Sequence, residues 1–113
     1  MDATGKRVLV VDDDAVLLRA VARELRAAGW EVRTIDIRCT PQRGEYDVAL
    51  LDWNPLGPEM AVRCLDVGLK FAIFTADEDV HGFPDVPIVR KPWQPGELDA
   101  ALRAAINKEN RSC

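Results

Sequence analysis

The sequence predicts an α/β protein in which helices cover both faces of a five-stranded parallel sheet. Two features of the chain support this fold class. Continuous apolar runs, such as residues 48–51, end directly at a polar side chain, which is typical of strands buried on both faces. Segments with the periodicity of an amphipathic helix alternate with these runs, and that alternation indicates a doubly wound sheet with right-handed crossovers.

The composition indicates one soluble domain. The 113 residues are 48% hydrophobic and 30% charged, and this length suits a single domain, residues 1–113, rather than two. No apolar run approaches the roughly 20 residues of a membrane span, and no signal peptide opens the chain, so we expect no membrane partner. A net charge of −4 argues against direct nucleic-acid binding. Cys39, Cys64 and Cys113 lack the spacing of a zinc site or a disulfide framework, which favours a cytoplasmic location.

The first strand is expected over residues 6–12, and a helix follows it. Asp14 can cap that helix, because a short side-chain oxygen accepts a free backbone N–H there. Gly29 is placed to end the helix in the left-handed conformation. The apolar stripe of the helix consists of Leu17, Val21 and Leu25.

A basic stripe lies on another face of the same helix. It consists of Arg19, Arg23 and Arg26. One interpretation is a solvated surface, and the other is a docking surface for an acidic partner.

The middle of the chain predicts an edge strand and a buried strand with little between them. Residues 31–36 alternate polar and apolar side chains, as an edge strand does. Residues 37–47 leave room for one or two helical turns at most, so the second helix of the fold is reduced. The third strand is expected over residues 48–52.

The next helix is expected to begin at Pro58, a residue suited to the first helical position, and to end at Gly68. Cys64 lies on its apolar stripe, so this thiol is expected to be a buried small residue rather than a reactive group. The stripe consists of Met60, Cys64 and Val67.

Two more strands and a last helix complete the predicted fold. The strands are expected over residues 70–75 and 86–90, and the nine residues 77–85 hold a single helical turn at best, so the fourth helix is reduced. Residues 108–113 are expected to fray. The stripe of the last helix consists of Leu98, Ala101, Leu102, Ala105 and Ile106.

Polar side chains follow four of the predicted strands and are expected to meet at one edge of the sheet. They are Asp12 and Asp13, Asp52, Thr75 and Lys91. Grouped carboxylates supply the hard oxygen ligands that Mg²⁺ prefers. A carboxylate can also act as a nucleophile toward phosphorus, while a lysine and a hydroxyl stabilise phosphoryl oxygens.

These motifs resemble those of response-regulator receiver domains of two-component signalling, and the resemblance covers essentially the whole chain. The matching segments are VLVVDDD at 8–14, LLDWN at 50–54, FTA at 74–76 and VRKP at 89–92. Each motif is weak alone, but four in the right order, each ending an apolar strand, are specific. The resemblance implies a flavodoxin-like sheet with the strand order 2-1-3-4-5.

The resemblance also implies roles for the pocket residues. Asp52 would be the phospho-acceptor, Thr75 the switch hydroxyl and Lys91 the lysine that reaches the phosphoryl group. Magnesium would be held by Asp12, Asp13, Asp52 and the backbone carbonyl of Asn54. Two neighbours are expected to modulate the site: Trp53, which could equally be a packing residue, and Asp77, which would flank the path of an attacking water with Asn54.

The chain departs from the family pattern at several positions. Ile88 stands where relatives carry a switch aromatic on the fifth strand, and Leu56 and Met60 stand where relatives carry Pro and Gly. We therefore expect the usual output surface built around that aromatic to be altered, with any change centred on the loops that border the pocket.

Three functions are compatible with these residues. The first is a phospho-accepting receiver that takes a phosphoryl group on Asp52, with Mg²⁺, from a histidine kinase or a histidine phosphotransfer protein. It would signal through an unknown downstream protein and catalyse only its own phosphorylation and dephosphorylation. The second is a receiver-like interaction module that works without phosphorylation. The third is a small phosphatase, which Asn54 argues against because that class typically has a second acid at this position.

Overall fold

The computed structural model describes residues 6–12, 14–35, 46–53, 57–76 and 86–107. Its strands are β1 (Arg7–Val11), β2 (Glu31–Ile35), β3 (Val48–Asp52), β4 (Phe71–Thr75) and β5 (Ile88–Arg90). Its helices are α1 (Ala15–Ala27), α2 (Gly57–Val67) and α3 (Glu97–Asn107). The predictions for residues 37–45, 77–85 and 108–113 lie outside the described residues.

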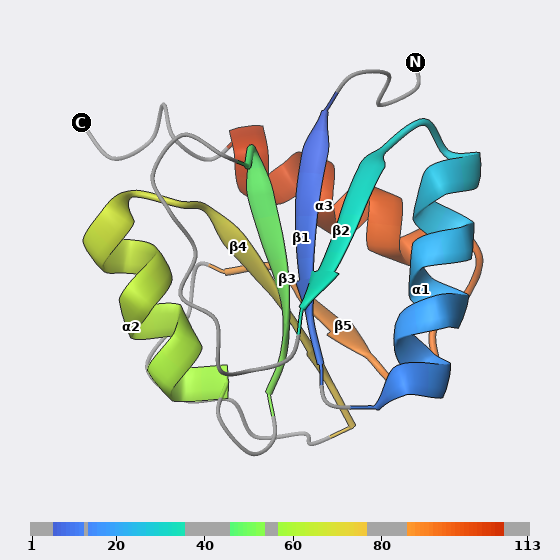
Figure 1. Cartoon of the computed structure of the whole chain (residues 1–113), viewed down its shortest axis with the longest axis horizontal. Helices are drawn as coiled ribbons and strands as arrows, with labels where there is room; N and C mark the ends of the chain where they lie inside the picture. The colour runs from blue at the N-terminus through green and yellow to red at the C-terminus, as the bar shows by residue number, and fades with distance from the viewer. Residues whose placement is uncertain (1–5, 13, 36–45, 54–56, 77–85, 108–113) are drawn as a thin grey trace.

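The strands form one sheet in the order β2-β1-β3-β4-β5 (Figure 1). All four neighbouring pairs are parallel. The predicted fold class and strand order are therefore confirmed. β2 lies at an edge, as its alternating sequence predicted, with Val32 half-buried and Glu31 and Arg33 exposed.

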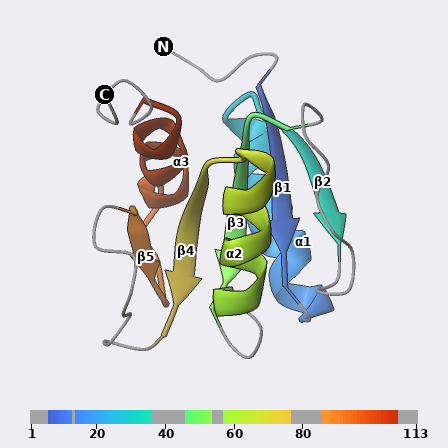
Figure 2. The same ribbon diagram turned by 90° about the vertical axis from the view of Figure 1, so that its left-hand side faces the viewer.

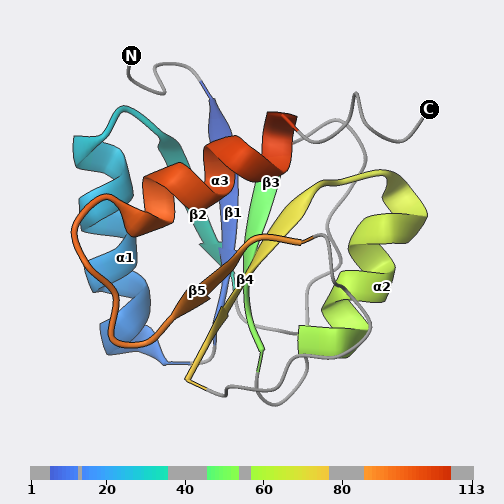
Figure 3. The same ribbon diagram turned by 180° about the vertical axis from the view of Figure 1, so that it is seen from behind.

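Helices cover both faces of the sheet. Figure 2 looks onto α2, and Figure 3, which shows the molecule of Figure 1 from behind, has α3 crossing the sheet in front. Val8 and Val10 of β1 pack in a cluster with α1 and α3, while Leu9 and Val11 pack in a second cluster with α2. Successive side chains of a strand point to opposite faces, so a strand with helices on both sides needs a continuous apolar run.

The ends of the helices follow from local chemistry. The Asp14 carboxylate accepts hydrogen bonds from the N–H groups of Val16 and Leu17 at 3.0 and 3.2 Å, which satisfies two free donors of α1. Gly29 follows α1 with φ of 103°, a left-handed conformation that suits glycine. Both predictions are confirmed.

Several predicted boundaries differ from the structure by one or two residues. β1 is expected over residues 6–12 and β4 over residues 70–75, and each observed strand is one residue shorter at the ends that differ. α2 begins at Gly57, so Pro58 is its second residue rather than its first. β5 spans only Ile88–Arg90, because Pro87 has no N–H to donate to a strand ladder. The Pro87 carbonyl still accepts a hydrogen bond from the Ile73 N–H at 2.9 Å. These differences leave the described pocket residues, Asp12, Asp52, Thr75 and Lys91, at the carboxyl edge of the sheet.

Cys64 is fully buried against the sheet, as its position on the apolar stripe of α2 predicted. Burial raises the pKa of its thiol to about 12. The thiolate is the nucleophilic form of cysteine, so this residue serves packing in the folded protein.

Candidate functional site

The carboxyl edge of the sheet brings together polar side chains from several strands. β1 and β3 are in register with Val11 beside Leu51, so Asp12 and Asp52 follow side by side. The Lys91 N–H donates to the Thr75 carbonyl at 2.9 Å, which extends the pairing of β4 and β5 by one residue. The predicted convergence of these strand ends is therefore found for Asp12, Asp52, Thr75 and Lys91.

The Lys91 ammonium lies between two carboxylates. Its Nζ atom is 2.8 Å from Asp52 Oδ1 and 4.0 Å from Asp12 Oδ2. The exposed fractions of the three side chains are 23% for Lys91, 10% for Asp52 and 2% for Asp12. Asp52 is thus the carboxylate of the pair that solvent reaches more easily, while Asp12 lies beneath it.

Burial makes the charge of Asp12 costly. The pKa of this carboxyl group is raised from 3.8 to about 6, mainly by burial and also by the nearby Asp52 charge. The Asp14 N–H, which donates to Asp12 Oδ1 at 2.9 Å, and Lys91 act in the opposite direction. Two carboxylates facing a single ammonium leave one negative charge without a partner in this cluster.

This surplus charge fits a divalent cation. Asp12 and Asp52 supply carboxylate oxygens, the hard donors that Mg²⁺ prefers, and a second positive charge would balance the cluster. The described residues alone do not form a group of three or more metal-ligating side chains. The further predicted ligands, Asp13 and the carbonyl of Asn54, lie outside the described residues, as does Asp77.

Three other predicted residues face the α2 side of the sheet. Thr75 is buried at the end of β4 and follows Ile73 in the strand alternation. The Trp53 side chain packs in the α2-side cluster, and the backbone N–H of Trp53 donates to the Phe74 carbonyl at 3.0 Å. Ile88 is half-buried against the same cluster. Trp53 therefore follows Asp52 in sequence but lies in the core.

Phe74 contacts the Lys91 side chain of the pocket, a contact that was not predicted from the sequence. Lys91 Nζ lies 4.6 Å from the centre of the Phe74 ring. Phe74 has the same parity on β4 as Ala72, which packs on the α1 and α3 side. That parity could have predicted its position, because Asp52 occupies the corresponding face of β3.

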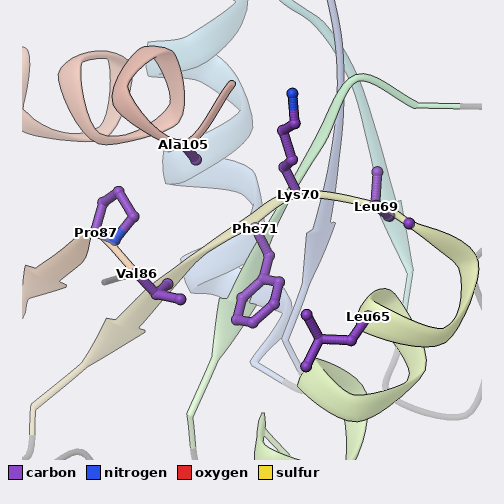
Figure 4. A pocket seen from close by; sticks show the side chains of 8 residues that line it. Leu65, Leu69, Lys70, Phe71, Val86, Pro87 and Ala105 are labelled. Atoms are coloured by element: carbon purple, nitrogen blue, oxygen red, sulfur yellow. The ribbon is translucent and has the colours of Figure 1, made fainter. Parts of the chain in front are cut away.

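A separate cavity of about 310 Å³ lies toward the amino edge of the sheet (Figure 4). Among the described lining residues Lys70 alone is charged, and its ammonium donates to the Ile106 carbonyl at 3.0 Å. These described residues include no carboxylate or hydroxyl, so the carboxyl edge is the better candidate for chemistry. The lining residues are Leu65, Gly68, Leu69, Lys70, Phe71, Val86, Pro87 and Ala105.

Across the part of the chain that the structure describes, every helix is too short or too polar to cross a lipid bilayer.

Known proteins resemble the chain in sequence and in structure. It is 30% identical, over an alignment 121 positions long, to the phosphate regulon transcriptional regulatory protein PhoB of Pseudomonas aeruginosa. The match covers 92% of this chain and 53% of that protein, so the chain spans about half the length of this relative. No family model matches the chain.

Two solved structures show the same fold. The signal receiver domain of an HD domain-containing protein from Pseudomonas fluorescens superposes with a TM-score of 0.75 at 20% identity, covering 95% of this chain and 98% of that one. The chemotaxis protein CheY4 of Vibrio cholerae superposes with a TM-score of 0.72 at 24% identity, covering 88% and 98%. The parallel sheet, the sequence relative and these structures together make the chain a receiver domain of the response-regulator family.

Proposed function

We propose that this receiver accepts a phosphoryl group on Asp52, with Mg²⁺, from a histidine kinase or a histidine phosphotransfer protein. The observation that carries the proposal is the position of the Asp52 carboxylate, 10% exposed at the carboxyl edge and 2.8 Å from the Lys91 ammonium. A nucleophile for phosphorus must be reachable, whereas its charge partners can be buried.

The transfer forms one bond and breaks one. A carboxylate oxygen of Asp52 bonds to phosphorus, the P–N bond of the phosphohistidine breaks, and its electron pair returns to the imidazole. Lys91 is placed to stabilise the charge that develops on the phosphoryl oxygens, and Thr75 would donate a hydrogen bond to one of them. Phosphoryl transfer is catalysed mainly by such positioning and charge stabilisation.

Asp12, Asp13, Asp52 and the carbonyl of Asn54 would hold the magnesium ion. When bound, magnesium would neutralise the crowded negative charge of the carboxylates and of the incoming phosphoryl group. The raised pKa of Asp12 supports this assignment, because it reflects a buried carboxyl group without enough positive charge nearby. Asp77 and Asn54 would flank the water that later hydrolyses the aspartyl phosphate.

The partners follow from this role. The phosphoryl donor would meet the carboxyl edge, and a downstream protein would read the phosphorylated state. Arg19, Arg23 and Arg26 of α1, together with Thr34 of β2, line a groove of about 550 Å³, which favours an acidic partner over a merely solvated stripe. We place the protein in the cytoplasm, where its scattered cysteines would stay reduced.

Incubation with acetyl phosphate and Mg²⁺, followed by intact-protein mass spectrometry, tests the proposal. The expected result is a gain of one phosphate that needs Mg²⁺ and is absent in Asp52→Asn. If Asp52→Asn still gained the mass of one phosphate, the phospho-acceptor would be another residue. A wild-type protein that gains no phosphate, from acetyl phosphate or from a phosphorylated phosphotransfer domain, would favour the phosphorylation-independent interaction module.

A further inference from the structure

Two aromatic side chains lie behind Lys91 on the α1 and α3 side of the sheet. Phe74 is buried on β4, and its backbone is the register partner of Asp52 on β3. Trp93 follows Lys91 by two residues and packs against the same cluster. Ile88, the position at which relatives carry their aromatic, faces the opposite side. The rings of Phe74 and Trp93 therefore lie on the same face of the sheet as the side chains of Asp52 and Lys91.

Phe74 limits where the Lys91 ammonium can go. The ring centre is 4.6 Å from Nζ, within the range at which a ring face attracts a cation. A lysine side chain has four flexible methylene groups and loses considerable rotamer freedom when it is fixed. A buried ring on one side and the Asp52 carboxylate 2.8 Å away on the other together hold it in one place.

Trp93 in turn fixes the Phe74 ring. The two rings meet edge to face, with centroids 5.1 Å apart and planes at 73°. The indole is itself anchored, because its Nε1 donates to Glu24 Oε1 of α1 at 2.8 Å. The contacts thus run from α1 through the indole and the phenyl ring to the ammonium at Asp52.

We propose that Phe74, supported by Trp93, is the positioning residue that holds Lys91 ready for phosphoryl transfer to Asp52. This inference rests on the proposed function for its kinetic test, but its geometry can be tested separately. In this role Phe74 acts on the reaction through Lys91 rather than through the phosphoryl group. Its removal should therefore matter only while Lys91 is present.

The matched pair of variants is Phe74→Leu and Phe71→Leu. Both remove a buried ring from β4, but Phe71 packs in the α2-side cluster at the other end of the strand. Phe74→Leu is expected to slow phosphorylation by acetyl phosphate about fivefold, the factor expected for losing one cation–ring attraction. Phe71→Leu should leave the rate within about twofold of wild type while losing comparable stability.

A double-mutant cycle separates positioning from general destabilisation. In a Lys91→Met background, Phe74→Leu should cause no further loss of rate. An equal slowing with and without Lys91, or equal slowing by Phe71→Leu, would overturn the proposal. Trp93→Leu should slow the reaction less than Phe74→Leu, because it acts one contact further away.

A spectroscopic measurement tests the geometry even in a protein that accepts no phosphate. The ε-methylene protons of Lys91 should show a ring-current shift in wild type that is lost in Phe74→Leu and kept in Phe71→Leu. An ordinary lysine shift in wild type would overturn the inference whatever the fate of the proposed function. If the ring-current shift were present but the protein accepted no phosphate, the result would count against the proposed function and therefore against the kinetic role of Phe74.

Discussion

At the amino edge of the sheet the Lys70 ammonium donates to the Ile106 carbonyl at 3.0 Å, whereas at the carboxyl edge the Lys91 ammonium donates to the Asp52 carboxylate at 2.8 Å. Lys70 satisfies one of the last carbonyls of α3, which have no partner within their own helix. Lys91 shares its charge between two carboxylates. The same residue type therefore completes the fold at one edge and leaves a charge imbalance at the other.

The acids of the two edges differ in the same way. Asp47, at the amino edge, is half-buried, accepts a hydrogen bond from the Arg7 N–H at 2.7 Å and has the Arg7 guanidinium 3.9 Å away. Asp12, at the carboxyl edge, is buried beside a second acid. Crowded, poorly compensated charge is costly for stability and useful for binding a cation or a phosphoryl group, which distinguishes a functional edge from a structural one.

The largest expected effect concerns the two lysines. Lys91→Met should slow phosphorylation by acetyl phosphate about 100-fold or more, because it removes the charge that stabilises the transferring group. Lys70→Met should leave that rate unchanged and lower the free energy of unfolding by about 1 kcal/mol. Both variants are tested by measuring the rate of phosphorylation by acetyl phosphate and the free energy of unfolding in urea. Equal rate losses from both would remove the distinction between the edges.

Asp12→Asn should raise the free energy of unfolding above pH 6 by up to about 3 kcal/mol. The pKa of Asp12 is raised from 3.8 to about 6, so the folded protein holds this proton more tightly than the unfolded chain does. The free energy of unfolding therefore falls as the pH rises from 3.8 to about 6, and it is not regained at higher pH. An uncharged Asn avoids that loss.

Urea unfolding at pH 4 and pH 8, without divalent ions, measures the effect. The gain from Asp12→Asn should shrink toward zero at pH 4, where the wild-type carboxyl group is protonated in the folded protein. Asp47→Asn is the matched control at the amino edge and should give no gain at pH 8. Lower stability of Asp12→Asn than of wild type at pH 8 would contradict the charge imbalance.

Magnesium should stabilise the carboxyl edge selectively. At an Mg²⁺ concentration ten times the dissociation constant, the free energy of unfolding should rise by about 1.4 kcal/mol. Asp12→Asn and Asp52→Asn should reduce the effect, because each removes a charged ligand. Thermal unfolding at pH 8 with Mg²⁺, compared with the same ionic strength of NaCl, provides the measurement. An undiminished rise in both variants would place the ion elsewhere.

The smallest expected effect belongs to the amino edge. Trp30, just before β2, donates from Nε1 to Asp99 Oδ1 of α3 at 2.7 Å. Trp30→Phe keeps most of the ring and should cost about 1 kcal/mol of stability. Phosphorylation by acetyl phosphate should be unchanged, since this bond lies at the opposite edge of the sheet from Asp52. A large rate loss in Trp30→Phe would show that the two edges are energetically linked.

Sequence patterns predicted the parts of the molecule that depend on local physics. The continuous run before Asp52 specified a strand buried on both faces, and Asp14 and Gly29 specified the ends of α1 because caps depend on a few neighbouring atoms. The boundary of β5 was less predictable, since Pro87 loses only its donor and can still accept a bond from β4.

The candidate site was predictable only in part. The order of the motifs placed Asp12, Asp52, Thr75 and Lys91 at one edge, because parallel strands end together. Which carboxylate is buried could not be read from the sequence, since Asp12 and Asp52 both end apolar strands. The contacts of Phe74 with Lys91 and Trp93 depend on how separate segments of the chain pack. The strand alternation in the sequence shows only the face of the sheet on which each residue lies.

The burial of Cys64 makes its thiol a chemical probe of how often α2 separates from the sheet. With its pKa raised to about 12, the thiol carries almost no reactive thiolate at neutral pH and is closed to reagents while α2 lies on the sheet. Alkylation of Cys64 therefore proceeds only during moments when α2 opens. The rate of that reaction, measured with and without acetyl phosphate and Mg²⁺, reports how often α2 separates from the sheet under each condition.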